Sequence, residues 1–193
     1  MVDNKQRTGD VIHLRGDSNA YCIIGDEPIL IDTGDPSSRE QIFSALDPYY
    51  RPDQIRHVIF THLHYDHVAN WENFTNATFY AHPLEIEAFQ SDPYGTVLEP
   101  HIAHSLKRCE MHDITRTSAF HGFLEVLHTP GHTMGSIIIA YPDKHILFTG
   151  DTLFRRGLVG RTDLPTSRPD KLSASLDIIA SYKKYDILPG HDY

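Results

Sequence analysis

The stretch THLHYDH, residues 61–67, places three histidines and one aspartate within seven positions, directly after the apolar run His57–Phe60. His62 and His64 can reach one metal ion, and Asp66 and His67 can reach a second ion beside it. Imidazole and carboxylate groups without thiolates suit divalent ions such as Zn²⁺, Fe²⁺ or Mn²⁺. Four ligands cannot complete two metal sites, so the motif requires further ligands elsewhere in the chain.

Three later segments supply such ligands. His132 lies in HTPGHTMGS, Asp151 in FTGDTLF and His191 in LPGHD, and a glycine precedes each of them. Glycine suits a backbone that turns sharply or closely approaches an ion. A water shared by two such ions loses a proton near neutral pH, which gives a hydroxide positioned to attack a carbonyl or phosphoryl centre without a serine or cysteine nucleophile. Hydrolysis is therefore the expected reaction, with Asp66 and Asp151 as the catalytic carboxylates.

Short apolar or β-branched runs must position these residues. Strands are predicted at residues 11–15, 20–24, 28–32, 57–61, 77–81, 123–128, 136–141, 145–149 and 186–188. Helices are predicted from Ser37, where Ser37 and Glu40 fit a capping box, from near Ser167, and over residues 83–89. Residues 62–67 are predicted to form a loop, because they contain too many polar groups for a buried strand and lack helical apolar spacing. A strand fixes the base of such a loop, so several side chains can turn toward one point. Many strands with interspersed helices indicate sheets stacked face to face with helices outside.

In these motifs the chain resembles the metallo-β-lactamase superfamily and its glyoxalase II-like subgroup. The resemblance runs from SNAYCIIGDEPILIDTGDP through THLHYDH, TPGHT and FTGDTLF to PGHD, in family order. It implies an α+β fold, an αββα sandwich of two mixed sheets. It also implies two divalent metal ions, with Zn²⁺ favoured over Fe²⁺ or Mn²⁺. The implied ligands are His62, His64 and His132 for the first ion, Asp66, His67 and His191 for the second, and Asp151 between them. Asp32 is then expected to orient a ligand rather than to bind metal.

The segment GDTLFRRGLVGRTDLP, residues 150–165, resembles glyoxalase II-like thioesterases and the related persulfide dioxygenases. Arg155, Arg156 and Arg161 are candidates for binding an anionic substrate. Adjacent arginines such as Arg155 and Arg156 on a surface loop are usually solvated, however, and Arg161 has an alternative role in a local ion pair with Asp163.

Two features depart from the glyoxalase II pattern. Asn70 stands where such proteins commonly have glycine. The helical domain that holds glutathione in glyoxalase II has no counterpart after His191, so either the substrate is held differently or it is not a glutathione thioester.

The expected function is therefore hydrolysis of a small thioester by a metal-bound hydroxide, and two alternatives remain. The first is a lactonase or small-ester hydrolase on the same site, although acyl-homoserine lactonases carry a tyrosine where this chain has Phe154. The second is a persulfide dioxygenase with one iron held by His62, His132 and Asp151.

Residues 91–122 form a long, polar and histidine-rich segment that is predicted to act as a lid over the site. Its histidines, His101 and His104 among them, are expected to be exposed or at the core edge rather than to form a third metal site.

Composition bounds the remaining expectations. The chain has 193 residues, of which 40% are hydrophobic, and it is expected to form one domain over residues 1–193. A net charge of −9 and the lack of a basic run argue against nucleic acid as a partner. No signal peptide or membrane span is recognisable, and two cysteines with no metal-type spacing indicate unpaired thiols, so a cytoplasmic protein acting on a small molecule is expected.

Overall fold

A computed structural model describes residues 11–193, which contain two mixed β-sheets. The first sheet has six strands in the order β1-β2-β3-β4-β5-β6, and β3 to β6 are parallel while β1 and β2 pair antiparallel. These strands are β1 (Val11–Leu14), β2 (Ala20–Ile23), β3 (Ile29–Ile31), β4 (His57–Ile59), β5 (Thr78–Ala81) and β6 (Met111–Asp113).

The second sheet has four strands in the order β10-β9-β8-β7, and only β9 and β10 pair in parallel. They are β7 (Glu125–His128), β8 (Ile137–Tyr141), β9 (Ile146–Gly150) and β10 (Asp186–Pro189). The parallel pairing sends β9 and β10 out of the sheet at the same edge, so the residues that follow them, Asp151 and His191, emerge close together.

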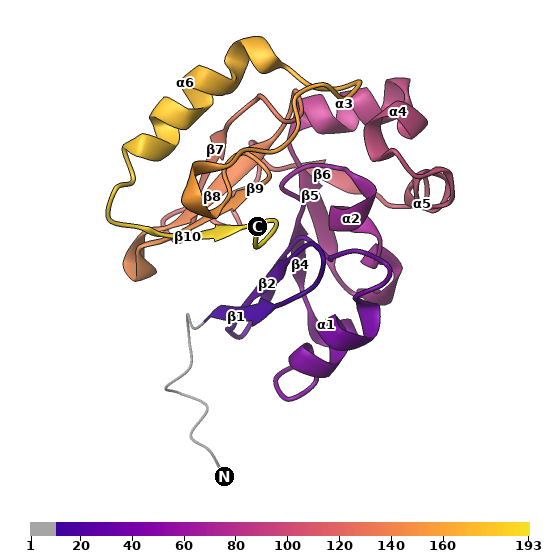
Figure 1. Cartoon of the computed structure of the whole chain (residues 1–193). Coiled ribbons are helices and arrows are strands. Elements are labelled where there is room, and N and C mark those ends of the chain that lie inside the picture. Colours follow the sequence, from indigo (N-terminus) through magenta and orange to yellow (C-terminus); the bar gives the residue numbers. More distant parts are fainter. Residues whose placement is uncertain (1–10) are drawn as a thin grey trace.

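The helices are α1 (Arg39–Leu46), α2 (Tyr65–Val68), α3 (Pro83–Ser91), α4 (Pro93–Val97), α5 (Pro100–Leu106) and α6 (Pro169–Ala180). Single 3₁₀ turns cover Pro52–Gln54, Trp71–Asn73, Pro142–Lys144 and Arg155–Gly157. In Figure 1, α6 lies outside the second sheet and α1 outside the first. No helix in residues 11–193 has the length and apolar character needed to cross a bilayer.

The fold has four layers, which are helices, the first sheet, the second sheet and α6. Three apolar clusters lie between successive layers. Ile139 of β8 is buried between the two sheets, whereas its neighbour Ile138 packs with Ile179 of α6 on the opposite face. In the first sheet Ile59 points to the centre, while Val58 packs against Ile42 of α1. Since successive strand residues point to opposite faces, each sheet is buried on both sides. This arrangement confirms the predicted αββα sandwich.

The first helix does not begin at Ser37, so the predicted capping box is wrong. The Asp35 carboxylate accepts hydrogen bonds from the Ser37 and Ser38 backbone N–H groups, at 2.8 and 3.2 Å. Ser38 occupies the cap position of α1, and its hydroxyl accepts from the Asp17 N–H instead of capping the helix. An aspartate upstream thus binds the Ser37 N–H, which the Glu40 side chain of the box was expected to bind.

The last helix begins at Pro169, two residues after the predicted start near Ser167. The Ser167 hydroxyl donates to the backbone oxygen of His132 at 2.7 Å, so it is engaged with a distant loop instead of the helix start.

Residues 91–122 contribute α4, α5 and β6 instead of one continuous loop. Val97, Ala103 and Leu106 are fully buried in the cluster under the first sheet. Much of the segment is therefore anchored in the core, and its role as a lid stays a prediction.

Candidate metal centre

The seven predicted ligand residues meet at one edge of the sandwich. Four chain segments bring them there: the stretch after β4, the loop between β7 and β8, and the residues that follow β9 and β10. Two backbone contacts hold these segments together, because Ile137 N donates to Thr61 O at 3.0 Å and Gly190 N donates to Gly150 O at 2.8 Å. Ligand atoms within 4.8 Å of one another form three groups, His62/His64/His132, His62/His67/Asp151 and Asp66/His67/His191.

The stretch after β4 contains a helical turn, so the prediction of a loop throughout residues 62–67 is wrong. Residues Tyr65–Val68 form α2, and His67 N donates to His64 O at 3.0 Å. Distant residues hold this turn, because Thr33 N donates to His67 O at 2.7 Å and the Ser18 hydroxyl donates to Asp66 O. Apolar spacing could not reveal a single turn fixed in this way.

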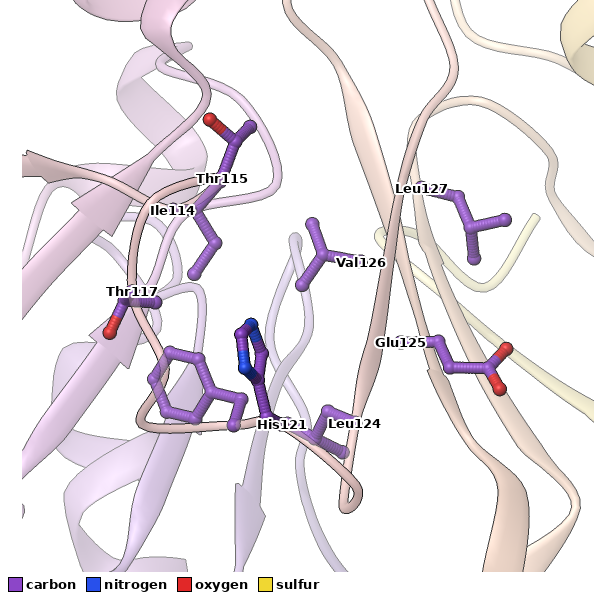
Figure 2. A pocket seen from close by; sticks show the side chains of 9 residues that line it. Ile114, Thr115, Thr117, His121, Leu124, Glu125, Val126 and Leu127 are labelled. Atoms are coloured by element: carbon purple, nitrogen blue, oxygen red, sulfur yellow. The ribbon is translucent and has the colours of Figure 1, made fainter.

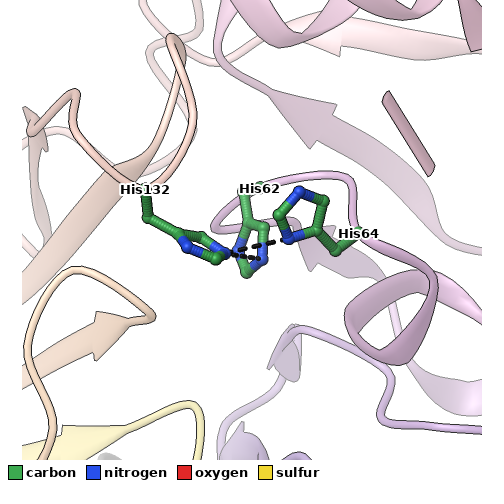
Figure 3. Close-up of side chains that lie close together, drawn as sticks. All are labelled: His62, His64 and His132. Carbon is green, nitrogen blue, oxygen red and sulfur yellow. Dashed lines mark hydrogen bonds between the residues drawn. The ribbon is translucent and has the colours of Figure 1, made fainter. Parts of the chain in front are cut away.

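We call His62, His64 and His132 the first subsite. Figure 3 shows the three rings converging from the two loops. His132 Nε2 lies 3.2 Å from His62 Nε2 and 2.9 Å from His64 Nδ1. Two nitrogen ligands at about 2.0–2.1 Å from one tetrahedral ion lie roughly 3.3 Å apart. The spacing of the nitrogens therefore fits a single bound ion.

Each imidazole ring has an inner nitrogen, which faces the other ligands, and an outer nitrogen, which faces away from them. The hydrogen-bond partner of the outer nitrogen determines whether the inner nitrogen carries a lone pair. His132 Nδ1 lies 2.7 Å from the Arg161 backbone oxygen, which can only accept, so Nδ1 carries the proton. The Thr61 hydroxyl donates to Asp32, which leaves it to accept from His62 Nδ1 at 3.1 Å. Both Nε2 atoms then present lone pairs to each other at 3.2 Å. A cation between them turns this repulsion into coordination.

We call Asp66, His67 and His191 the second subsite. His191 Nε2 lies 3.2 Å from Asp66 Oδ2, and His67 Nε2 lies 3.8 Å from the same oxygen. The outer nitrogen of His191 faces the Asp17 backbone oxygen at 2.7 Å. As in the first subsite, a carbonyl on the outside directs the other nitrogen inward.

Asp151 lies between the two subsites and is 8% exposed. Its Oδ1 is 3.2 Å from His67 Nε2, and its Oδ2 is 3.5 Å from both His132 Nε2 and His191 Nε2. His67 Nε2 and Asp151 Oδ1 are both buried, and their ion-pair contact lacks the geometry of a hydrogen bond. Buried polar atoms without hydrogen bonds are costly, and metal coordination would satisfy both. The donor set therefore fits a pair of divalent ions.

Protonation differs between the subsites. Burial lowers the pKa of His64 to about 3, and it holds the pKa of His62 well below the usual range. Burial also disfavours charge on the second-subsite histidines, but neighbouring carboxylates outweigh it and raise the pKa of His191 to about 10 and that of His67 well above normal. In the metal-free protein the first subsite is thus neutral, and the second holds protons that a metal ion would displace.

Asp32 contacts the predicted ligand His67, and its role in orienting that ligand stays a prediction. Its Oδ2 lies 2.8 Å from His67 Nδ1 and accepts from the Thr61 hydroxyl at 2.7 Å. Its backbone adopts a left-handed conformation, with φ of 56°, which is uncommon outside glycine, asparagine and aspartate. The conformation places one carboxylate against both ends of the ligand stretch.

Gly190 precedes His191 because no side chain fits there. A Cβ atom at this position would lie 2.2 Å from Asp151 Oδ1 and 2.7 Å from His67 Cε1. The predicted close approach of a glycine to the site therefore has a steric cause.

The arginines near the site differ in their partners. Arg161 forms two hydrogen bonds of 2.9 Å with the Asp163 carboxylate, as expected for the local ion pair. Arg155 Nε lies 3.8 Å from Asp192 Oδ1. Arg156 is exposed and has a left-handed backbone, with φ of 63°. Substrate binding by Arg155 and Arg161 stays a prediction.

Two residues have roles that the sequence did not reveal. The Asn70 side-chain amide donates to the backbone oxygens of Thr33, Gly34 and Asp35, at 2.8, 3.2 and 3.1 Å. The Tyr193 ring stacks on the His191 ring with centroids 5.0 Å apart. Neither contact has a local signal, since the partners of Asn70 lie more than thirty residues away and an exposed tyrosine has no characteristic spacing.

A separate cavity of about 420 Å³ lies between β7 and the loop 114–124. Figure 2 shows Ile114, Thr115 and Thr117 on one side and the β7 residues on the other. No ligand residue lines it, so it is distinct from the metal centre.

The sequence pattern of the metallo-β-lactamase superfamily matches residues 13–191. A probable metallo-hydrolase of Methanocaldococcus jannaschii is 35% identical over 188 residues, which cover 90% of this chain and 87% of that protein. A hydroxyacylglutathione hydrolase of Aeromonas hydrophila is 34% identical over 158 residues, which cover 79% of this chain but only 52% of that enzyme. A crystal structure of a protein in a di-iron-bound form superposes with a TM-score of 0.72 at 26% identity, over 95% of this chain and 92% of that one. The chain therefore belongs to the metallo-β-lactamase superfamily and is one of its metal-dependent hydrolases.

Proposed function

We propose that the protein is a dinuclear hydrolase that cleaves small thioesters. The observation that supports two metal ions best is the pair of histidine–carboxylate clusters that share Asp151. A persulfide dioxygenase with one iron would use His62, His132 and Asp151 and would leave the second subsite without a role. The relative in a di-iron-bound form supports the same stoichiometry.

In this proposal His62, His64 and His132 would hold the first ion, Asp66, His67 and His191 would hold the second, and Asp151 would contribute to both sites. Zn²⁺ is the favoured metal because the set contains imidazoles and carboxylates, although Fe²⁺ and Mn²⁺ accept the same ligands. When bound, two such ions supply a water that is deprotonated near neutral pH and Lewis-acid stabilisation of the developing oxyanion.

The chain's own contribution is to fix the orientation of the histidine side chains that would bind the metal ions. Backbone oxygens of Asp17 and Arg161 and the carboxylate of Asp32 fix the outer nitrogens of His191, His132 and His67. The inner nitrogens are therefore already directed toward the metal sites before the substrate arrives, which limits reorganisation during the reaction.

The preference for thioesters rests on Phe154, which stands where acyl-homoserine lactonases carry a tyrosine. The Phe154 ring packs edge-on against the His191 ring at 5.7 Å and offers no hydroxyl group. A leaving thiolate has a conjugate acid with a pKa of about 8.5, so it needs less protonation than the alkoxide of a lactone. The hydroxyacylglutathione hydrolase relative supports this choice. The match covers about half of that enzyme, so small thioesters in general are proposed rather than glutathione thioesters alone.

Substrate contacts are the finer part of the proposal. Arg161 already has a carboxylate partner in Asp163, whereas the longer Arg155–Asp192 pair is easier for an anionic substrate to replace. We therefore favour Arg155 over Arg161 as the group that binds a substrate carboxylate.

The test compares substrates on one zinc-loaded preparation. S-acyl thioesters and N-acyl homoserine lactones of matched acyl length are assayed side by side, with free thiol, ring opening and dissolved oxygen followed. Thioesters should be cleaved faster, without oxygen uptake, and Asp151→Ala serves as the inactive blank. Introducing the hydroxyl with Phe154→Tyr should raise lactone opening more than thioester cleavage. Faster lactone opening by the unmodified protein would overturn the thioesterase assignment, and oxygen uptake with glutathione persulfide would favour the dioxygenase.

A further inference from the structure

The carboxylate of Glu85, in α3, is fully buried beside the first subsite and is not itself a ligand in the proposed set. It accepts three hydrogen bonds. Leu63 N donates to Oε2 at 3.0 Å, while Gly135 N and the Thr133 hydroxyl donate to Oε1 at 2.9 and 2.5 Å. All three partners are donors, which is the pattern that a carboxylate satisfies.

These donors come from the two segments that carry the first subsite. Leu63 separates His62 from His64, and Thr133 directly follows His132. One carboxylate therefore joins two ligand segments that are almost seventy residues apart. A backbone hydrogen bond from Ile137 N to Thr61 O, at 3.0 Å, also joins these two segments, but at residues that lie outside the stretch from Leu63 to His64 and the turn from His132 to Gly135.

The loop after His132 packs directly on α3. A Cβ atom at Gly135 would lie 2.6 Å from the Glu85 backbone nitrogen and 2.7 Å from its Cγ. Glycine at position 135 thus permits the approach that the Oε1 hydrogen bond requires.

Burial of a carboxylate is expensive, and removing it from water costs several kcal/mol even after relaxation. No Lys or Arg is among the partners of Glu85, so backbone and hydroxyl donors alone offset that cost. An apolar side chain would fill the same volume without the cost. An apolar side chain would not, however, form hydrogen bonds to both the His62–His64 segment and the His132 loop, so it would not fix the distance between them.

His64 depends on this connection more than the other two ligands do. The outer nitrogens of His62 and His132 have partners, whereas His64 Nε2 is buried without a hydrogen bond. Its ring is therefore placed by its backbone, and the N–H of the preceding residue, Leu63, is the one that Glu85 binds.

We propose that Glu85 is a positioning residue that sets the affinity of the first subsite for its metal ion, by fixing the distance between the His62–His64 segment and the His132 loop. The proposal rests on the proposed function only in taking these three histidines as metal ligands, and it is independent of the substrate.

The test measures Zn²⁺ affinity in an Asp66→Ala background, in which the first subsite is expected to remain, by competition with a chromophoric chelator. Glu85→Gln keeps Oε1 for the His132 loop but presents an amide N–H group to Leu63 N. We expect affinity to fall about 10–100-fold, as for other groups that orient metal ligands. Glu87→Gln is the matched control, because Glu87 is exposed on the same helix and its substitution should leave the affinity unchanged.

Thr133→Val is a second variant that keeps the buried charge and removes one of its three donors. It is expected to weaken Zn²⁺ binding less than Glu85→Gln, and it keeps the test decisive if Glu85→Gln does not fold. A purely structural role would lower the melting temperature and weaken both binding steps of the two-metal protein. The proposal instead requires the second step to stay unchanged.

Folded Glu85→Gln and Thr133→Val proteins with unchanged affinity for the first Zn²⁺ ion would overturn the proposal. A loss of affinity in a protein that cleaves no thioester would leave the positioning role standing and would overturn only the substrate assignment.

Discussion

The Asp32 carboxylate binds His67 Nδ1 at 2.8 Å while it also accepts from the Thr61 N–H at 2.8 Å and from the Thr61 hydroxyl at 2.7 Å. Thr61 directly precedes His62, so one side chain connects the start of the ligand stretch to its end. The same contact fixes the proton of His67 on Nδ1 and leaves Nε2 free to face Asp151.

Asp32→Asn should weaken metal binding about 10–100-fold. Asparagine tolerates the left-handed backbone, but its amide group replaces one of the oxygens that now accept hydrogen bonds. Zinc titration of the metal-stripped variant measures the effect, with Asp53→Asn, at an exposed position, as the control. Unchanged affinity would show that His67 is oriented by its packing alone.

Asp66→Ala should reduce the metal content of the protein from two ions to one and remove most of the hydrolytic rate. Asp66 is a proposed ligand of the second subsite, whereas His62, His64 and His132 remain in place. Elemental analysis of the variant beside the unmodified protein counts the metal. Two retained ions, or one ion in both proteins with full activity, would contradict the dinuclear assignment.

Asn70→Ala should lower the free energy of unfolding by about 1–3 kcal/mol, because the backbone oxygens of Thr33, Gly34 and Asp35 lose their shared donor. Denaturant unfolding of the metal-loaded protein measures this change. Asn76→Ala is the control, because Asn76 is exposed and its side-chain amide donates to the Asp53 backbone oxygen. Equal stability of the two variants would mean that water replaces the Asn70 amide.

The lowered pKa of His82 predicts that the free energy of unfolding decreases at acid pH. Burial and the stacked His128 ring, 4.0 Å away, lower the pKa of His82 to about 4 from an unfolded value of 6.5. Below pH 6.5 the unfolded chain binds a proton that the folded chain does not, so this contribution to stability is complete above pH 6.5 and is lost progressively toward pH 4.

His82→Asn should flatten that part of the stability profile. Asparagine can still accept the Leu84 N–H hydrogen bond at the start of α3 but does not titrate. Urea unfolding between pH 4 and pH 7 compares the variant with the unmodified protein, and exposed His121→Asn serves as the control. A profile as steep as that of the unmodified protein would remove His82 as its cause.

The sequence by itself was enough to predict the sandwich and to bring together the candidate ligands. Continuous apolar runs such as Ile137–Tyr141 indicate strands that are buried on both faces, because no alternate residue in them is polar. His62, Asp151 and His191 could be found because each stands at or just past the end of a recognisable strand, among glycines and other turn residues. Residue type and position along the chain suggested both inferences, and the resemblance to the superfamily supplied the αββα order and the division of the ligands between two ions.

The tertiary structure alone decided how those ligands are held. The contacts of Asp32 with His67, Asn70 with Thr33, and Glu85 with Leu63 and Gly135 join segments that are 22 to 50 residues apart. Local spacing carries no information about such pairs, since side-chain hydrogen bonds form only after the layers have packed. The helical turn at Tyr65–Val68 was missed for the same reason, because distant backbone partners stabilise it rather than an apolar face of its own.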